Sequence, residues 1–173
     1  ALQATSGTFS ADSTINGVTV GKGANSVATN TALGVNALTS ATTGVRNTAI
    51  GSGALDALTT GDNNIAIGDQ ALGANVTGSN NVSVGRNAMI VSTGTDNNTA
   101  VGRSALQQNA ASNNTAVGRD ALAANTTGTR NIAVGGLALD ANTTASDNVA
   151  MGYAAGGAIT TGTENVTVGN YAG

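Results

Sequence analysis

The sequence contains no cysteine, histidine, proline or tryptophan, and only three of its 173 residues are aromatic. Without cysteine the fold cannot use disulfide bonds, so its stability has to come from packing and hydrogen bonding. Without histidine or cysteine the common catalytic bases and nucleophile pairs are missing, so we expect neither an enzyme nor a cofactor. The apolar residues are mostly Ala, Val, Leu and Ile. Such a composition favours a fibrous or solenoid body built from many thin layers.

Charged residues are also scarce, at 9% of the chain, and the formal net charge is −3 with only six basic residues. This balance gives no basic surface of the kind that nucleic-acid binding requires. No run of 18 apolar residues is present, so no segment is expected to insert into a membrane. The nine carboxylates are scattered and the nonapeptide pattern of calcium-binding β-helices is missing, so we expect no bound metal.

A repeat of 17 residues runs through most of the chain. Its most regular feature is an Asn that opens the motif NTA(V/I/L)G, and only the spacing between Asn98 and Asn114 is shorter, at 16 residues. The nine repeats start at Asn30, Asn47, Asn64, Asn81, Asn98, Asn114, Asn131, Asn148 and Asn165. Such a period indicates a solenoid. We therefore expect an N-terminal lead-in over 1–15, a short atypical first coil over 16–29, and about nine coils over 30–173, of which the last is incomplete.

The columns of the repeat predict the structure of one coil. Counting the Asn as position zero, positions one to three alternate β-branched or aliphatic residues with a small residue, which is typical of a short strand. Position four is always Gly, which allows a bend with positive φ. The Asn column is expected to stack as a ladder of side-chain amides, from Asn47 to Asn165. Position seven is always Ala, and this structural column includes Ala54, Ala71, Ala88, Ala105, Ala121 and Ala138.

The packing of the coil is predicted from the same columns. We expect both strand faces to be packed, with the large residues at positions one and three against a core. The Ala at position two would then allow close approach of a second chain. The segment around positions seven and eight, Ala followed in most coils by Leu, fits either a doubly buried strand or one helical turn. Because one coil is too thin to be stable alone, the coils are expected to stack about 4.8 Å apart.

The pattern NTAVGxxAL…NTTGxxNTAVG resembles the repeats of bacteriophage tail-fibre proteins, and residues 16–34 resemble the entry into those repeats. More distantly, NSVA at 25–28 and NTAIG at 47–51 are similar to the head coils of trimeric autotransporter adhesins. Those heads are left-handed parallel β-rolls with shorter coils than the 17 residues found here. Both families are homotrimers. The resemblance therefore implies an all-β, parallel β-solenoid that assembles as a homotrimer.

The resemblance also implies a structural and adhesive function. The chain would be a shaft or head segment of a tail fibre on a virion, spacing or presenting a site that binds the host receptor. Its partners would be further copies of itself, host-surface polysaccharide and other fibre proteins. The alternative is the head of a trimeric adhesin on a bacterial cell surface. A third possibility is an ice-binding rod, because Thr pairs recur near the coil ends, although adjacent threonines on a strand would point to opposite faces.

One basic column is a candidate binding site. Arg86, Arg103 and Arg119 occupy position five in three successive coils. Stacked about 4.8 Å apart, these like charges repel each other, so a neighbouring anion would stabilise them. They are a candidate contact for an anionic glycan, and the alternative is ion pairing or solvation. Tyr153 and Tyr171 could stack on a sugar ring or fill space in the core.

The sequence ends nine residues into its final repeat, at Gly173. Solenoids usually end in atypical capping repeats, because an uncovered coil exposes apolar side chains and unpaired backbone groups. We therefore expect the natural chain to continue beyond Gly173, into further coils or a tip domain. The source open reading frame tests this expectation, and a stop codon directly after Gly173 would contradict it.

Overall fold

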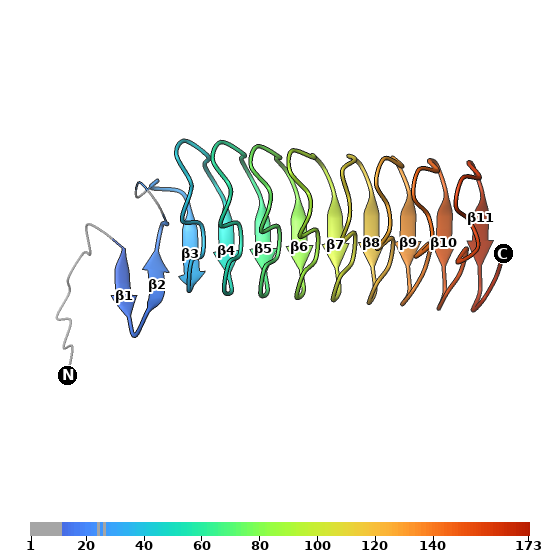
Figure 1. Ribbon diagram of the computed structural model, residues 1–173, viewed down its shortest axis with the longest axis horizontal. Helices are drawn as coiled ribbons and strands as arrows, with labels where there is room; N and C mark the ends of the chain where they lie inside the picture. The colour runs from blue at the N-terminus through green and yellow to red at the C-terminus, as the bar shows by residue number, and fades with distance from the viewer. Residues whose placement is uncertain (1–11, 24, 26) are drawn as a thin grey trace.

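The computed structural model describes residues 12–23, 25 and 27–173, which form an elongated stack of coils (Figure 1). Eleven short strands make one sheet in which neighbours in the sequence are also hydrogen-bonded neighbours. The strands are β1 (Ser13–Ile15), β2 (Val18–Gly21), β3 (Thr31–Gly34), β4 (Thr48–Ile50), β5 (Ile65–Ile67), β6 (Val82–Val84), β7 (Thr99–Val101), β8 (Thr115–Val117), β9 (Ile132–Val134), β10 (Val149–Met151) and β11 (Val166–Val168).

From β3 to β11 the strands are parallel and in register. Each repeat position therefore lies beside the same position of the next coil, as Ala100 lies beside Ala116. These strands and the turns between them make about eight complete coils, and the described residues contain no α-helix. The predicted all-β, parallel solenoid with coils of about 17 residues is thus confirmed. The sequence predicts about nine coils, and the repeat that starts at Asn165 adds β11 without a complete turn.

The lead-in differs from the coils in strand direction. Strands β1 and β2 form an antiparallel hairpin, and β2 is also antiparallel to β3 (Figure 1). Asn16 and Gly17 connect the hairpin with φ angles of 51° and 82°, as a two-residue type I′ turn requires. The carboxylate of Asp12 accepts the N–H groups of Lys22 and Gly23, both at 2.6 Å. The segment 16–29, expected as a short first coil, thus contributes an antiparallel strand over the start of the stack; residues 1–11 of the lead-in lie outside the described part.

Small residues, rather than large ones, fill the inside of the coil behind the strand. The residue at position two is at most 1% exposed in the eight coils from β3 to β10. These residues are Ala32, Ala49, Ala66, Ser83, Ala100, Ala116, Ala133 and Ala150. Since alternate residues of a strand point to opposite faces, positions one and three point away from this interior. The expectation that large residues face the core and Ala faces a second chain is therefore wrong, because the coil leaves room behind the strand only for a side chain as small as Ala or Ser.

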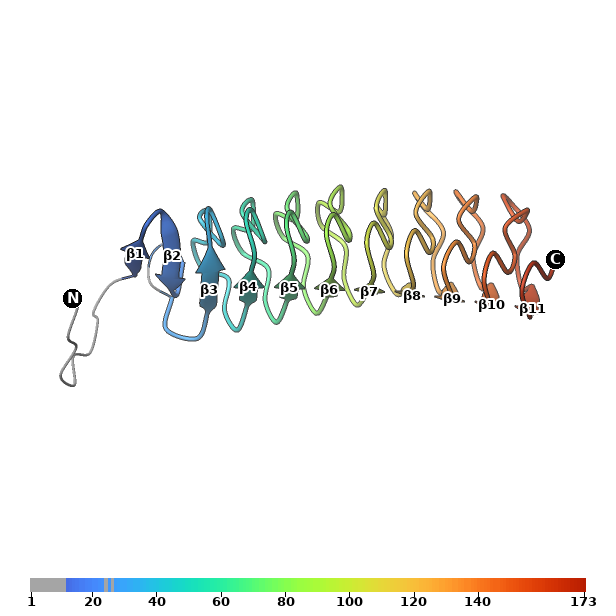
Figure 2. The same cartoon turned by 90° about the horizontal axis from the view of Figure 1, so that it is seen from below.

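Large aliphatic side chains consequently cover the outer face of the sheet. In Figure 2 the strands lie along one side of the rod and the connecting segments along the other. The large side chains of this face that are more than a third exposed are Leu33, Ile65, Ile67, Val101, Val117, Ile132, Met151, Val166 and Val168. We call the outward side chains at positions one and three of β3 to β11 the exposed sheet face.

The second half of each coil is a series of turns, so neither the strand nor the helical turn considered from the sequence is present. Position seven is a buried Ala, and position eight is a fully buried Leu or Met from Leu38 to Leu139. That residue adopts a left-handed φ, from 50° at Leu122 to 53° at Leu38. This conformation costs about 1–2 kcal/mol per residue. Burial of the side chain, worth about 1.5–3 kcal/mol, offsets that cost.

The Gly column at position four is required by two separate constraints. Gly102 has a φ of 136°, a conformation that residues with a side chain rarely adopt. A Cβ added there would lie 2.4 Å from the carbonyl oxygen of Gly118 in the next coil. The same close approach to the backbone of the next coil recurs from Gly34 to Gly152, so a coil can stack on the next only where its own position four is Gly.

We predict that Gly102→Ala lowers the free energy of unfolding by about 3 kcal/mol, from backbone strain and overpacking together. Gly136→Ala is the matched control, because Gly136 has no positive φ and its added Cβ would lie 3.4 Å from the nearest atom, on Tyr153. Chemical denaturation followed by circular dichroism measures both variants. Equal stability of the two would contradict this role of the Gly column.

Candidate functional site: polar ladders and exposed faces

The Asn column lies inside the rod as a continuous hydrogen-bonded ladder. The backbone N–H of each member donates to the side-chain Oδ1 of the Asn one coil earlier, with N–O distances of 2.9–3.0 Å. Most members also donate from Nδ2 to a carbonyl 14 residues later, as Asn64 does to Gly78 at 2.8 Å. The donating members are Asn47, Asn64, Asn81, Asn98, Asn114, Asn131, Asn148 and Asn165. One side chain thus closes its own coil and joins it to the next.

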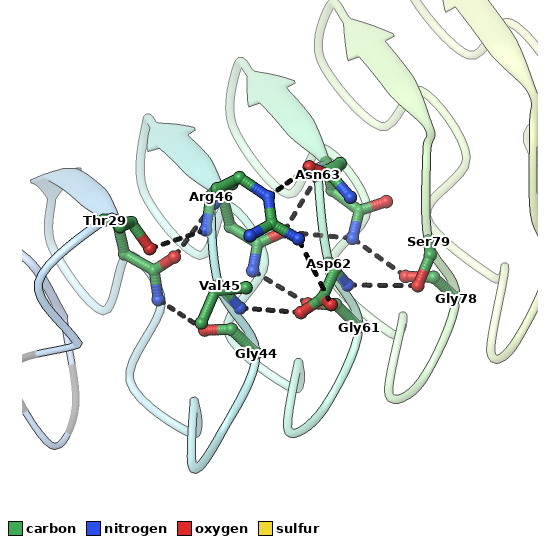
Figure 3. Close-up of polar contacts among 12 residues, drawn as sticks. Thr29, Gly44, Val45, Arg46, Gly61, Asp62, Asn63, Gly78 and Ser79 are labelled. Carbon is green, nitrogen blue, oxygen red and sulfur yellow. Dashed lines mark hydrogen bonds and ion pairs between the residues drawn. The ribbon is translucent and has the colours of Figure 1, made fainter.

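A second ladder runs beside the first, at the corner before each strand (Figure 3). The N–H of Val45 donates to Oδ1 of Asp62 at 2.8 Å, and the N–H of Asp62 donates to Oγ of Ser79 at 3.0 Å. The same pattern continues from Ser79 to Asp96 and from Asp96 to Ser112. This ladder was not predicted. Its signal in the sequence is an Asp, Ser or Thr two residues before the Asn in every coil from Asp62 onward.

Each arginine of the candidate glycan column has a carboxylate neighbour in this chain. Arg86 lies 3.6 Å from Asp69, while Arg103 and Arg119 contact the same carboxylate, Asp120, at 3.0 and 2.6 Å. The side chains of Arg103 and Arg119 are 51% exposed, and that of Asp120 is 19% exposed. Two guanidinium groups therefore share one carboxylate, which leaves one positive charge in excess at the surface.

A further ion pair joins two coils at the surface. Arg130 donates from Nε to Oδ1 of Asp147 at 2.6 Å and from Nη2 to Oδ2 at 2.7 Å. The hydrogen bond from Arg130 lowers the pKa of Asp147 and raises that of Arg130. Because the carboxyl pKa is lower in the folded state, the pair contributes stability above the unfolded value of about 3.9 and loses it as the pH falls through the folded pKa. Solvent screening keeps this contribution small.

The two C-terminal tyrosines lie at the surface and do not fill the interior. Tyr153 is 41% exposed and Tyr171 is 74% exposed. Their rings meet edge to face, with centroids 5.4 Å apart and an interplanar angle of 72°. The ring of Tyr153 also lies against Gly136, which has no side chain to displace it. Tyr153 is thus held in place on two sides while much of the ring remains accessible.

The recurring Thr pairs lie in turns rather than in strands. Their members are exposed or half-buried, so the strand argument that neighbouring threonines point to opposite faces does not apply. Some hydroxyl groups already serve the stack: Oγ1 of Thr42 donates to the carbonyl of Thr59 at 2.9 Å, and Oγ1 of Thr126 to that of Thr143 at 2.8 Å. The row is also interrupted at 110–111, where two Ala residues take its place.

The exposed sheet face is an apolar surface that runs along the stack from β3 to β11. Positions one and three of β3 to β11 contain only Thr, Val, Ile, Leu and Met, so no charge interrupts this face. Many of its large side chains are more than a third exposed, including Val101 at 36% and Met151 at 46%. Contiguous apolar surfaces of this kind typically mark interaction sites.

Comparison with known proteins identifies no relative: no protein-family model, no curated protein and no solved structure matches the chain. Over residues 12–23, 25 and 27–173, no group of three or more Asp or Glu side chains is placed to hold a metal ion. In the same part of the chain, no helix is long and apolar enough to cross a membrane. The class that the structure defines is a parallel β-solenoid with a buried Asn ladder, a half-buried polar ladder at the corner and an exposed apolar face.

We predict that Asn114→Asp strongly destabilises the rod while Asn113→Asp does not. Asn114 is fully buried and donates from Nδ2 to the carbonyl of Gly128 at 2.8 Å, whereas Asn113 is exposed. A carboxylate at 114 would face that carbonyl without a proton to donate, at a cost of about 3 kcal/mol near neutral pH. The exposed change should stay within about 0.5 kcal/mol.

The pH dependence provides a second readout for the same pair. Burial raises the pKa of a carboxyl group, so the penalty at 114 should grow as the pH rises from about 4 towards neutrality. Melting temperatures between pH 4 and 8 measure this trend. Similar melting curves for the two variants over the whole range would show that the ladder does not hold the coils together.

Proposed function

We propose that the chain is a structural and adhesive segment of an extracellular fibre and that it works as a homotrimer. The observation that carries this proposal is the exposed sheet face, which offers aliphatic side chains from nine successive strands without a charge. A monomer in water would leave this face uncovered. Association of identical chains removes it from water and so contributes free energy in proportion to the buried apolar area.

A threefold arrangement suits the geometry of this surface. Three parallel rods related by a threefold axis can each turn the sheet face towards that axis, which gives a closed assembly with one shared apolar interior. The contact between chains would then use positions one and three of the strands. The Ala at position two, expected from the sequence to lie between chains, is buried within its own coil and takes no part.

The rod itself suits a spacer. Its hydrogen bonds run along the axis in every layer, through the strands, the turns and both polar ladders. A shaft or head segment of a phage tail fibre, which spaces or presents a host-receptor site on the virion, fits this build and the resemblance of the NTAVG repeats. The head of a bacterial surface adhesin is the alternative. Phage tail and baseplate genes beside the source gene support the first, and a C-terminal membrane anchor in the full-length chain supports the second.

An ice-binding rod is a second candidate, and one observation favours it. The exposed sheet face contains Thr at position one in four coils, among aliphatic residues at intervals of about 4.8 Å. These residues are Thr31, Thr48, Thr99 and Thr115. A homotrimer would cover the same face, so the two functions exclude each other. Thermal hysteresis from a monomeric chain would favour the ice-binding function.

We predict that light scattering gives about three times the chain mass of 16.5 kDa. The double substitution Val101→Lys and Val117→Lys places two charges on the exposed sheet face and should convert the trimer to monomer, because a buried unpaired charge is costly. Thr127→Lys is the matched control, since Thr127 is exposed on a turn away from that face. The proposal would be refuted if the unsubstituted protein were a folded monomer with the same strand signal in circular dichroism. It would also be refuted if Thr127→Lys dissociated the trimer and the double substitution did not.

A further inference from the structure

We infer that Arg103, Arg119 and Tyr153 form a binding strip for an acidic saccharide. This inference rests on the proposed adhesive function, because it assigns the fibre segment a ligand of its own. The strip lies along position five of successive coils, which also contains Arg86 and Gly136. Position five follows the bend at the end of each strand, two residues beyond the outward residue at position three.

The charge of the strip favours an anionic ligand of low charge density. Three of the six basic residues of a chain with net charge −3 lie in this one column. Arg103 uses Nη2 and Arg119 uses Nη1 to contact Asp120, and their other side-chain donors have no hydrogen-bond partner within the described residues. A guanidinium group has five N–H donors in a planar fork that matches a carboxylate. A polyanion such as nucleic acid would be repelled by the acidic remainder of the chain.

The aromatic ring selects for a ligand with an apolar face. Tyr153 lies two coils beyond Arg119, and the position between them is Gly136. An added Cβ at Gly136 would lie 3.4 Å from Cδ2 of Tyr153 and 3.8 Å from the carbonyl oxygen of Arg119. The ring therefore leans over the glycine towards the arginine. Tyr171 contacts the ring of Tyr153 edge to face. This contact holds the Tyr153 ring in position to stack against the C–H groups of a sugar ring.

Together these groups fit an oligosaccharide with carboxylates. One sugar ring would stack on Tyr153, and a carboxylate on a neighbouring sugar would bind the guanidinium groups of Arg119 and Arg103. The axial distance from Arg119 to Tyr153 is two layers, about 10 Å, which a short oligosaccharide can span. The side chain of Asp120 stays between the two arginines and orients them.

The test uses a hyaluronan tetrasaccharide, with one carboxylate for every two sugars, as the acidic probe and cellotetraose as the neutral comparison, with binding measured by calorimetry and by saturation-transfer NMR. Native protein should bind the acidic probe more tightly, and less so at high salt. Arg119→Gln and Tyr153→Ala should each weaken that binding by about tenfold or more. Arg130→Gln is the matched control, because Arg130 is equally an exposed, ion-paired arginine but lies outside the strip.

Gly136→Leu is a second test, since its side chain would push the ring of Tyr153 away from Arg119 and should also weaken binding. Circular dichroism and light scattering on the same samples separate a failed binding site from a failed fold or assembly. Absence of binding by a native, assembled protein overturns the saccharide site but leaves the proposed fibre function intact. Equal loss with Arg130→Gln also overturns it, because it would show attraction by surface charge in general.

Discussion

The whole structure depends on one constraint: every layer must present the same hydrogen-bonding groups to the next layer at one inter-strand spacing. The Asn ladder meets this constraint most completely. Each side chain accepts the N–H of the following coil through Oδ1, and most also donate to a carbonyl that ends their own coil, as Asn47 does to Gly61 at 2.8 Å. Because these groups are buried, an unmatched member would cost about 1–3 kcal/mol, so the column tolerates little variation.

The shortened coil shows how the constraint operates when a residue is missing. The loss between Asn98 and Asn114 falls in the turn, and the N–H of Asn114 still reaches Oδ1 of Asn98 at 2.9 Å. The disturbance appears instead at position eleven of the repeat, where Asn75, Asn109, Asn125 and Asn142 are buried. Asn125 donates to Oδ1 of Asn109, and its own Oδ1 is a buried side-chain oxygen without a hydrogen-bond partner in the described part of the chain. The missing residue changes the turn before Asn114 and the hydrogen bonding of the Asn125 side chain, while strands β7 and β8 remain in register.

The narrow coil also links packing to assembly. Its interior accommodates Ala from the strand and a Leu held in a left-handed turn, which leaves no room for the large residues of positions one and three. These residues must point outward, where they create an apolar face along the rod. The same geometry that makes each layer thin therefore supplies the surface through which we propose that the chains associate, while the turns that follow the strands carry the arginines and tyrosines.

The 17-residue period and the residue type at each repeat position determined much of the architecture of this protein. They placed the strands at positions one to three, the bends at Gly and the stacked Asn column, because in-register stacking repeats the same residue at the same place in each layer. Only the tertiary structure decided which strand face is inside, since an alternating pattern separates two faces without assigning either to the core. The left-handed φ of residues such as Leu106, and the sharing of Asp120 by two arginines, likewise follow from contacts between coils. Those contacts are set by the path of the backbone between strands, which local propensity does not contain.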